Sequence, residues 1–199
     1  NKAELQRMLE LSENPDAPLI AIITRLASHK GVDLILRVFQ EILDTGAQFV
    51  VLGTGERRYE QFFLDQSYHH AGQVAAAICF AQELSHKIYA GADLLLMPSE
   101  IEPCGISQLI AMRYGTIPIV RETGGLSDTV TAFNPETGEG NGVNFINYNA
   151  HDMLDAVRRS VSYYQEKQAW ETLVKNAMKT DSSWSKSTKE YLKLYRSMK

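Results

Sequence analysis

Short apolar runs alternate along the chain with longer stretches in which apolar residues recur at helical spacing. The runs are apolar at nearly every position and rich in Val and Ile, which is typical of strands buried on both faces of a sheet. They predict strands at residues 19–24, 49–53, 74–80, 93–98, 116–120 and 143–146. Strands that alternate with helices predict an α/β fold with a Rossmann-like, doubly wound, parallel six-stranded sheet.

Helices are expected between and after these strands. The clearest covers 31–46, where apolar residues at i, i+3 and i+4 follow one face and Gly46 ends the run. The same reasoning predicts a short amphipathic helix at the N-terminus and helices at 56–69, 83–90, 105–114, 125–132, 151–164, 169–179 and 184–198. Because doubly wound sheets bind ligands at the carboxyl ends of their strands, the residues after each strand are the first candidates for a site.

The loops after the first two strands carry cations and glycines. Arg25 and Lys30 lie in one loop, and Gly31 opens the helix that follows. Two cations beside a helix N-terminus can converge on a diphosphate, although a solvated basic loop explains them equally well. After the second strand, Gly53 and Gly55 let the backbone approach a phosphate or sugar, but a single Gly-x-Gly pair more often marks a tight turn.

The third apolar run ends on an aromatic residue, Phe80. Its ring can offer a face for a flat base, whereas an aromatic at a strand end is more often part of the core. His86, on the helix that follows, is interpreted as a structural histidine.

The fourth run is followed by the stretch SEIEPCGIS. Pro103 and Gly105 shape a turn in it. The N–H groups of Ile106 and Ser107 then open a helix and form an anion site. Glu102 stands directly before that site and would repel a phosphate there. We therefore expect Glu102 to accept hydrogen bonds from the hydroxyls of a neutral group attached to the phosphate.

The fifth run leads to a second glycine-bearing helix start, Thr123-Gly124-Gly125. Two such helix starts and the cations Arg25 and Lys30 would surround one point above the sheet. This combination indicates a nucleotide diphosphate that carries a polyhydroxy group, which is a nucleotide sugar.

Composition and charge restrict the partner. The 199 residues are 44% hydrophobic and 22% charged, which is typical of a globular protein with a sizeable core. A net charge of −4 creates no basic field for nucleic acid or anionic lipid. The longest apolar run, 74–81, is too short to cross a bilayer, and the N-terminus has no signal-peptide pattern. We expect a small ligand, with no nucleic-acid and no membrane partner.

Cysteine usage and the acidic residues indicate that no metal is needed. Cys79 and Cys104 have neither zinc-site nor disulfide spacing, which favours a reducing compartment. Cys104 is interpreted as a small residue in a crowded turn rather than as a nucleophile. No Asp-x-Asp pair is present to bridge a divalent ion to a diphosphate, so we expect no metal and no cofactor. The chain begins at Asn1 rather than Met, and we expect a fragment of a longer protein.

Four spaced motifs resemble one enzyme family. RLASHKGVDLI, EPCG, RETGGLSDTV and DSSW occur in this order, and together they resemble the C-terminal half of bacterial glycogen synthases and plant starch synthases. The resemblance implies one half of a retaining GT-B glycosyltransferase, which transfers glucose from ADP-glucose to the non-reducing end of an α-1,4-glucan. It also implies a cytoplasmic location in a bacterium, or a plastid in a plant.

The resemblance further implies roles for individual residues. Arg25 and Lys30 would stabilise the departing diphosphate, and Glu102 would lie beside the sugar, so these three would be catalytic. ADP-glucose would be bound by residues at the strand ends and helix starts, namely Gly53, Phe80, Cys104, Gly105, Ile106, Ser107, Thr123, Gly124 and Gly125. Whether the retaining step has a covalent intermediate stays open.

The same resemblance divides the chain in two. Residues 1–180 would form the nucleotide-sugar-binding domain, and 181–199 a terminal helix that crosses to a missing N-terminal domain, which would bind most of the glucan acceptor. Two other functions stay open. One is a UDP-sugar-dependent retaining transferase of the same architecture, against which EPCG argues because such relatives usually carry bulkier apolar residues in place of Cys104. The other is a nucleotide-binding module that is not catalytic when isolated.

Overall fold

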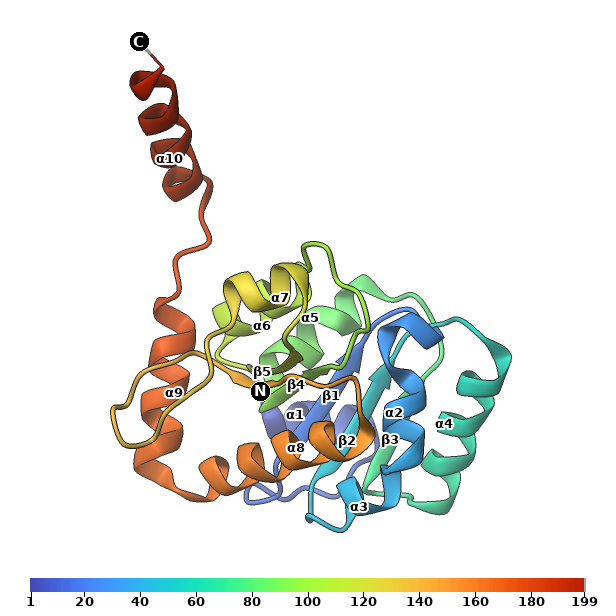
Figure 1. Ribbon diagram of the computed structural model, residues 1–199. Coiled ribbons are helices and arrows are strands. Elements are labelled where there is room, and N and C mark those ends of the chain that lie inside the picture. Colours follow the sequence, from blue (N-terminus) through green and yellow to red (C-terminus); the bar gives the residue numbers. More distant parts are fainter. Residues whose placement is uncertain (199) are drawn as a thin grey trace.

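The structure, a computed structural model, describes residues 1–198. A parallel sheet forms its centre (Figure 1). Its strand order is β3-β2-β1-β4-β5-β6. The strands are β1 (Leu19–Ile23), β2 (Gln48–Leu52), β3 (Val74–Ala77), β4 (Leu94–Met97), β5 (Ile117–Arg121) and β6 (Val143–Phe145). All the neighbouring pairs are parallel. The predicted doubly wound, parallel six-stranded sheet is therefore confirmed.

Helices cover both faces of the sheet (Figure 1). One face carries α1 (Lys2–Met8), α5 (Gln82–Gly91), α6 (Ser107–Tyr114) and α7 (Gly124–Thr129). The other carries α2 (Val32–Arg37), α3 (Phe39–Leu43), α4 (Arg57–His69), α8 (Ala150–Gln165) and α9 (Lys167–Lys179). Within β1, Leu19 and Ala21 pack toward the first group, and Ile20 and Ile22 toward the second. Burial on both faces explains why the strands are apolar at successive positions.

The single helix predicted at 31–46 is wrong, because the structure has two short helices there. The break falls at Val38, whose φ of −123° and ψ of 25° leave the helical range. The bend directs Phe39 into an aromatic cluster, where its ring meets those of Phe49 and Phe63 edge-on at centroid distances of 5.1 and 5.9 Å. Periodicity alone does not reveal such a break, because both short helices keep the same apolar face.

Two predicted boundaries also shift near the carboxyl edge of the sheet. β3 ends at Ala77 and not at residue 80, because the N–H of Cys79 turns back to donate to the carbonyl oxygen of Ala77 at 3.0 Å. The helix predicted from residue 105 begins at Ser107, because Gly105 has a left-handed φ of 73°. Both shifts lengthen the loops that follow β3 and β4.

A half-buried cation joins the N-terminal helix to the sheet. Lys2 Nζ lies 2.6 Å from Asp93 Oδ2 and donates to the carbonyl oxygen of Ala17 and to the hydroxyl of Tyr164 at 2.6 and 2.8 Å. Asp93 also accepts a hydrogen bond from the N–H of Leu19, at the start of β1. This network joins α1, β1 and the end of α8.

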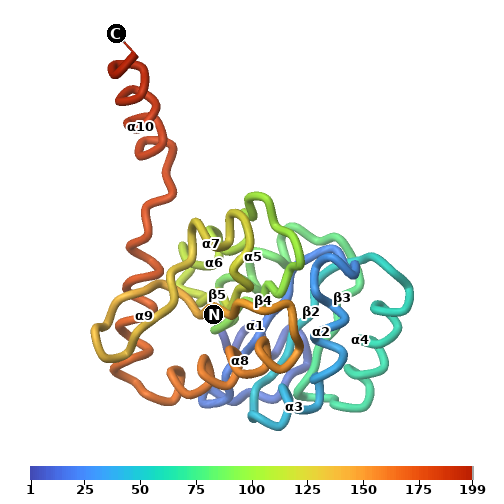
Figure 2. Tube along the Cα trace, viewed as in Figure 1, coloured from blue at the N-terminus to red at the C-terminus, as the bar shows by residue number. Residues whose placement is uncertain are grey.

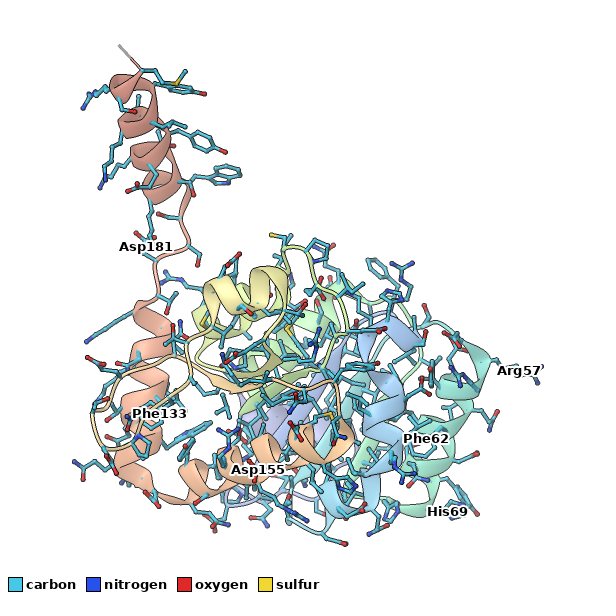
Figure 3. All side chains as sticks on the ribbon, in the orientation of Figure 1. Arg57, Phe62, His69, Phe133, Asp155 and Asp181 are labelled. Carbon is cyan, nitrogen blue, oxygen red and sulfur yellow. The ribbon has the colours of Figure 1, made fainter. Side chains whose placement is uncertain are left out.

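The last helix, α10 (Trp184–Ser197), stands away from the sheet (Figure 2). Figure 3 shows Asp181 on the connection from α9 and the α10 side chains projecting into open space. Every described residue from 181 onward is exposed, including Trp184 at 84% and Tyr195 at 60%. The expected division at residue 180 and the crossing of this segment to another domain both stay predictions. Over residues 1–198, no helix combines the length and apolar character that a membrane span needs.

Candidate functional site

The centre of the sheet contains the point at which its winding reverses. β1 and β4 are neighbours, yet the chain continues from β1 toward one edge of the sheet and from β4 toward the other. In open α/β sheets the loops after two such strands diverge and leave a crevice that binds ligands. A cavity of about 90 Å³ lies there, and its lining includes Thr24, Lys30, Ser99 and Glu102.

An ion pair spans this cavity. Lys30 Nζ lies 2.7 Å from Glu102 Oε2, and the two side chains are only 20% and 13% exposed. Ser99 Oγ donates to the same carboxylate oxygen at 3.1 Å. The cation and the carboxylate expected to face a nucleotide sugar therefore lie side by side, although they come from loops 72 residues apart in sequence.

Gly31 brings the Lys30 loop against β4. Lys30 lies in the short 3₁₀ helix η1 (Ser28–Lys30), and Gly31 follows it with a left-handed φ of 75°. A Cβ at Gly31 would stand 2.1 Å from the carbonyl oxygen of Pro98. Only glycine permits both the backbone conformation and this close approach. Close packing against Pro98 therefore explains why glycine occupies position 31 at the start of the helix.

The side chain of Gln108, a fully buried residue, holds the turn after Glu102 by hydrogen bonds to its backbone. Its Nε2 donates to the carbonyl oxygens of Cys104 and Gly105, both at 3.1 Å. α6 then begins at Ser107, and the first N–H groups of a helix have no carbonyl of a preceding turn to bond. Gly105, Ile106 and Ser107 line the same cavity as Lys30 and Glu102. The anion site expected at this helix start is therefore close to the ion pair.

The glycines of the second helix start pack closely against the loop of Glu102. The N–H of Gly125 donates to the carbonyl oxygens of Glu102 and Pro103 at 3.0 and 3.2 Å, so it is already bonded within the protein. A Cβ at Gly125 would lie 2.0 Å from the carbonyl oxygen of Cys104, and one at Gly124 would lie 2.2 Å from that of Glu102. Both glycines thus let α7 press against the loop of Glu102, and binding of ADP-glucose by Gly124 and Gly125 stays a prediction.

Thr123 supports the same loop. It is the N-cap residue of α7, and its Oγ1 lies 3.5 Å from the carbonyl oxygen of Glu100, as a donor at the limit of hydrogen bonding. The Thr-Gly-Gly turn and the EPCG turn thus pack together as one structural unit.

A larger groove adjoins the cavity at the ends of β1, β2 and β3. It measures about 480 Å³, a size that accommodates a nucleoside. Its lining includes Arg25, Gly53, Cys79 and Phe80, and Ile23 and Thr24 line both spaces. The Phe80 ring is 94% exposed, so it is not part of the core. Phe80, the expected stacking face for a base, and Arg25, one of the two expected cations, therefore line the same groove.

Gly53 makes that groove possible by a close backbone approach. A Cβ at Gly53 would stand 1.9 Å from the carbonyl oxygen of Thr24, so any other residue would push the ends of β1 and β2 apart. The N–H of Leu26 also donates to the carbonyl oxygen of Thr54 at 2.9 Å. Gly53 therefore shapes the groove.

Both cysteines are free thiols on the surface. Cys79 lines the larger groove, and Cys104 lies in the turn after Glu102. Within residues 1–198, no group of three or more His, Cys, Asp or Glu side chains is arranged to hold a metal ion. Transfer without a metal stays a prediction.

Residues 7–179 match the protein family described as glycosyl transferases group 1. The chain belongs to this family.

Within this family of glycosyltransferases, the chain is similar to bacterial glycogen synthases. Over 198 residues it is 54% identical to a glycogen synthase from Bacillus cereus (strain Q1), covering 100% of this chain and 42% of that protein. It is 54% identical over 194 residues to a glycogen synthase from Fusobacterium nucleatum, covering 98% of this chain and 42% of that one. The chain thus spans less than half the length of these relatives. The resemblance that the four motifs indicated is confirmed.

A solved structure supports the architecture. The catalytic domain of starch synthase IV from Arabidopsis thaliana, solved with ADP and acarbose bound, superimposes with a TM-score of 0.88 at 37% identity. The match covers 98% of this chain and 41% of that one. The predicted Rossmann-like half of a GT-B glycosyltransferase is confirmed.

Sequence reasoning missed the side chains that support the site of this glycosyltransferase chain. Ser99 and Gln108 hold Glu102 and its turn, and Arg121, at the end of β5, donates to the carbonyl oxygen of Ser99 at 2.9 Å. Arg121 could have been recognised from the sequence, because this cation directly follows the apolar run 116–120. Gln108 carried a weaker signal, since an amide that is buried has to find hydrogen-bond partners.

Proposed function

We propose that this chain is the donor-binding part of a glycogen or starch synthase, which transfers glucose from ADP-glucose to the non-reducing end of an α-1,4-glucan with retention. The observation that carries the proposal is the Lys30–Glu102 pair at the reversal point of the sheet, beside the groove of Arg25 and Phe80. The names of the relatives, and the ADP and acarbose of the starch synthase structure, support it.

The two spaces suit the two ends of a nucleotide sugar. The groove at Phe80 takes the adenosine, with the exposed ring as a stacking face for the base. The second phosphate lies at the cavity of Lys30 and Glu102, and the glucose lies at the mouth of this cavity, within reach of Glu102. Since Ile23 and Thr24 line both spaces, the diphosphate crosses the end of β1, where Arg25 and Lys30 are the nearby cations.

Charge stabilisation of the leaving group is the main catalytic effect in this proposal. When the bond between the sugar and the diphosphate breaks, negative charge grows on the phosphate oxygens. Arg25 and Lys30 stabilise that charge more strongly in the transition state than in the bound donor. An ammonium has three N–H donors, so Lys30 can bond a phosphate oxygen and keep its contact with Glu102. No metal and no further cofactor are required.

Glu102 acts on the sugar in this proposal. A carboxylate accepts hydrogen bonds and cannot donate them, so it suits glucose hydroxyls and repels phosphate oxygens. Ser99 and Lys30 both bond Oε2, which leaves Oε1 for a hydroxyl. The turn from Cys104 to Ser107 follows directly and offers the N–H groups at the start of α6 to the phosphate.

The remaining expectations concern the longer protein, which we call the complete synthase. The apolar side chains of α10 are proposed to pack on its other domain, and that domain to bind most of the glucan acceptor. We propose a cytoplasmic location in a bacterium, or a plastid in a plant.

Incorporation of labelled glucose into glycogen by the complete synthase tests the proposal, with ADP-glucose and UDP-glucose as alternative donors. We expect ADP-glucose to be the better donor and the new linkages to be α-1,4. Lys30→Ala should abolish most of the transfer. Lys175→Ala is the matched control, because Lys175 is also paired with a glutamate, Glu171, but on the exposed surface of α9. A preference for UDP-glucose, or equal effects of the two variants, would contradict the proposal.

A further inference from the structure

One arginine joins the ends of three neighbouring strands. Arg121 is the last residue of β5, and its Nε donates to the carbonyl oxygen of Ser99, just beyond β4, at 2.9 Å. Its Nη2 donates to the carbonyl oxygen of Glu100, and its Nη1 to that of Ile146, just beyond β6, at 3.4 Å. A planar guanidinium with five N–H groups can satisfy three carbonyls at once.

Two of the three carbonyls held by Arg121, those of Ser99 and Glu100, belong to the loop of Glu102. Ser99 is 2% exposed, and its hydroxyl donates to Glu102 Oε2 at 3.1 Å. Fixing the Ser99 backbone therefore fixes the hydroxyl that orients the carboxylate.

Glu100 ties the same loop to the loop of Lys30. Its N–H donates to the carbonyl oxygen of His29 at 2.9 Å, while its own carbonyl oxygen accepts from Arg121. His29 directly precedes Lys30. The separation between the two loops, and hence the geometry of the Lys30–Glu102 pair, depends on this residue.

Tyr148 closes the network from the other side. The guanidinium carbon of Arg121 lies 5.7 Å from the centre of the Tyr148 ring, and the Tyr148 hydroxyl donates to the carbonyl oxygen of Ser28 at 3.1 Å. Burial, together with the charges of Glu100 and Asp33, raises the pKa of this hydroxyl above its ordinary value of 10. The hydroxyl thus keeps its proton and remains a donor at neutral pH.

We propose that Arg121 is a positioning residue for sugar transfer, which holds the loop of Glu102 in register with the loop of Lys30. It touches neither the sugar nor the diphosphate, and it acts through Ser99 and Glu100. The inference rests on the proposed function and deepens it. A lysine in this place would keep the charge but could not reach three carbonyls, because its donors radiate from one nitrogen.

A double-mutant cycle in the complete synthase tests this inference. The variants are Arg121→Lys, Glu102→Gln and the pair together, and kcat and KM for ADP-glucose are measured for each. Arg121→Lys alone should lower kcat by about 10²-fold, the effect of misplacing a reacting group by roughly 1 Å. KM should change much less. In the Glu102→Gln background the same substitution should have little further effect, because it acts through Glu102.

Two further variants separate positioning from stability. Arg159→Ala is the matched control, since Arg159 also holds a backbone carbonyl, that of Asn144 at 2.8 Å, but from α8. It should leave kcat unchanged. Tyr148→Phe removes only the hydroxyl that bonds Ser28 and keeps the ring, so it should fold normally and still lower kcat.

The outcomes distinguish this inference from the proposed function. If Glu102→Gln lowers kcat while Arg121→Lys and Tyr148→Phe do not, the inference is overturned and the proposed function stands. Equal losses from Arg121→Lys in both backgrounds would also overturn it, because they would show a general structural effect. If Glu102→Gln alone leaves kcat unchanged, the role proposed for Glu102 fails, and the inference fails with it.

Discussion

Lys30 and Glu102 form a partly buried ion pair, with 2.7 Å between Lys30 Nζ and Glu102 Oε2, at the only place in the described sheet where the winding reverses. Each side chain is the other's ion-pair partner in residues 1–198. The pair therefore keeps both charges compensated before a donor binds, and it places a cation and a hydrogen-bond acceptor within one ligand's reach.

Lys30→Ala should slow transfer far more than it weakens binding of ADP. The lost contact stabilises charge that grows only in the transition state, and loss of one such contact lowers turnover by about 10²- to 10³-fold. Steady-state kinetics of the complete synthase and calorimetric titration with ADP measure the two effects. Equal losses in turnover and in ADP affinity would contradict a leaving-group role.

Glu102→Gln should also lower turnover while ADP binding is nearly unchanged, because ADP lacks the sugar that Glu102 is proposed to contact. The amide keeps the size of the carboxylate but loses its charge and one acceptor oxygen. Steady-state kinetics of the complete synthase and calorimetric titration with ADP measure these two effects. Weaker ADP binding with normal turnover would place Glu102 at the nucleotide instead of the sugar.

Phe80→Ala should weaken ADP binding by about 1–3 kcal/mol, which is the range for stacking of a base on an aromatic ring. The ring is 94% exposed, so its loss should leave the free energy of unfolding nearly unchanged. Tyr68→Ala is the control, since Tyr68 is 82% exposed on α4, outside the groove. Calorimetric titration with ADP measures the effect, and equal affinities of the two variants would rule out Phe80 as the base platform.

Gly125→Ala should destabilise the fold by about 1–3 kcal/mol, as overpacking does. The new Cβ would lie 2.0 Å from the carbonyl oxygen of Cys104 and force the Glu102 loop away from α7. Ser127→Ala, at an exposed position of the same helix, is the control. Unfolding in urea, followed by circular dichroism, compares the two. Wild-type stability of Gly125→Ala would show that the contact is not tight.

Asp93 should make stability depend on pH. Burial raises the pKa of its carboxyl above the ordinary value of 3.8, although Lys2 and the N–H of Leu19 lower it in part. The folded chain therefore binds this proton more tightly than the unfolded chain. Asp93 stabilises the fold fully below pH 3.8, and this contribution is lost as the pH rises through the higher folded pKa.

The free energy of unfolding of wild type minus that of Asp93→Asn isolates this contribution, since asparagine does not titrate. The difference should fall as the pH increases from about 3.8. A difference for Asp93 that rises with pH would contradict the direction of the shift.

The fold could be predicted because its strands have a strong pattern. Burial on both faces makes each strand apolar at successive positions, and helical spacing separates the strands. The break at Val38 could not be predicted, because packing of Phe39 among other rings causes it and the apolar period continues through it. The end of β3 was missed for a similar reason, since 78–80 are as apolar as the strand itself.

The parts of the candidate site that directly follow a strand could be predicted from the sequence. Lys30, Glu102 and the start of α6 follow adjacent strands, and they do line one cavity. The role of Gly125 was not predictable, because a glycine at a helix start serves a ligand or a close packing contact with the same sequence pattern. Arg121 was missed because its partners are backbone carbonyls, which no side-chain motif records.

Calorimetric titration of the 199-residue chain with ADP and with UDP tests the central claim most directly, which is that this chain holds the nucleotide of ADP-glucose at the carboxyl edge of its sheet. We predict binding of one ADP per chain, weaker binding of UDP, and loss of affinity in Phe80→Ala. No heat of binding with ADP, or tighter binding of UDP, would contradict the account.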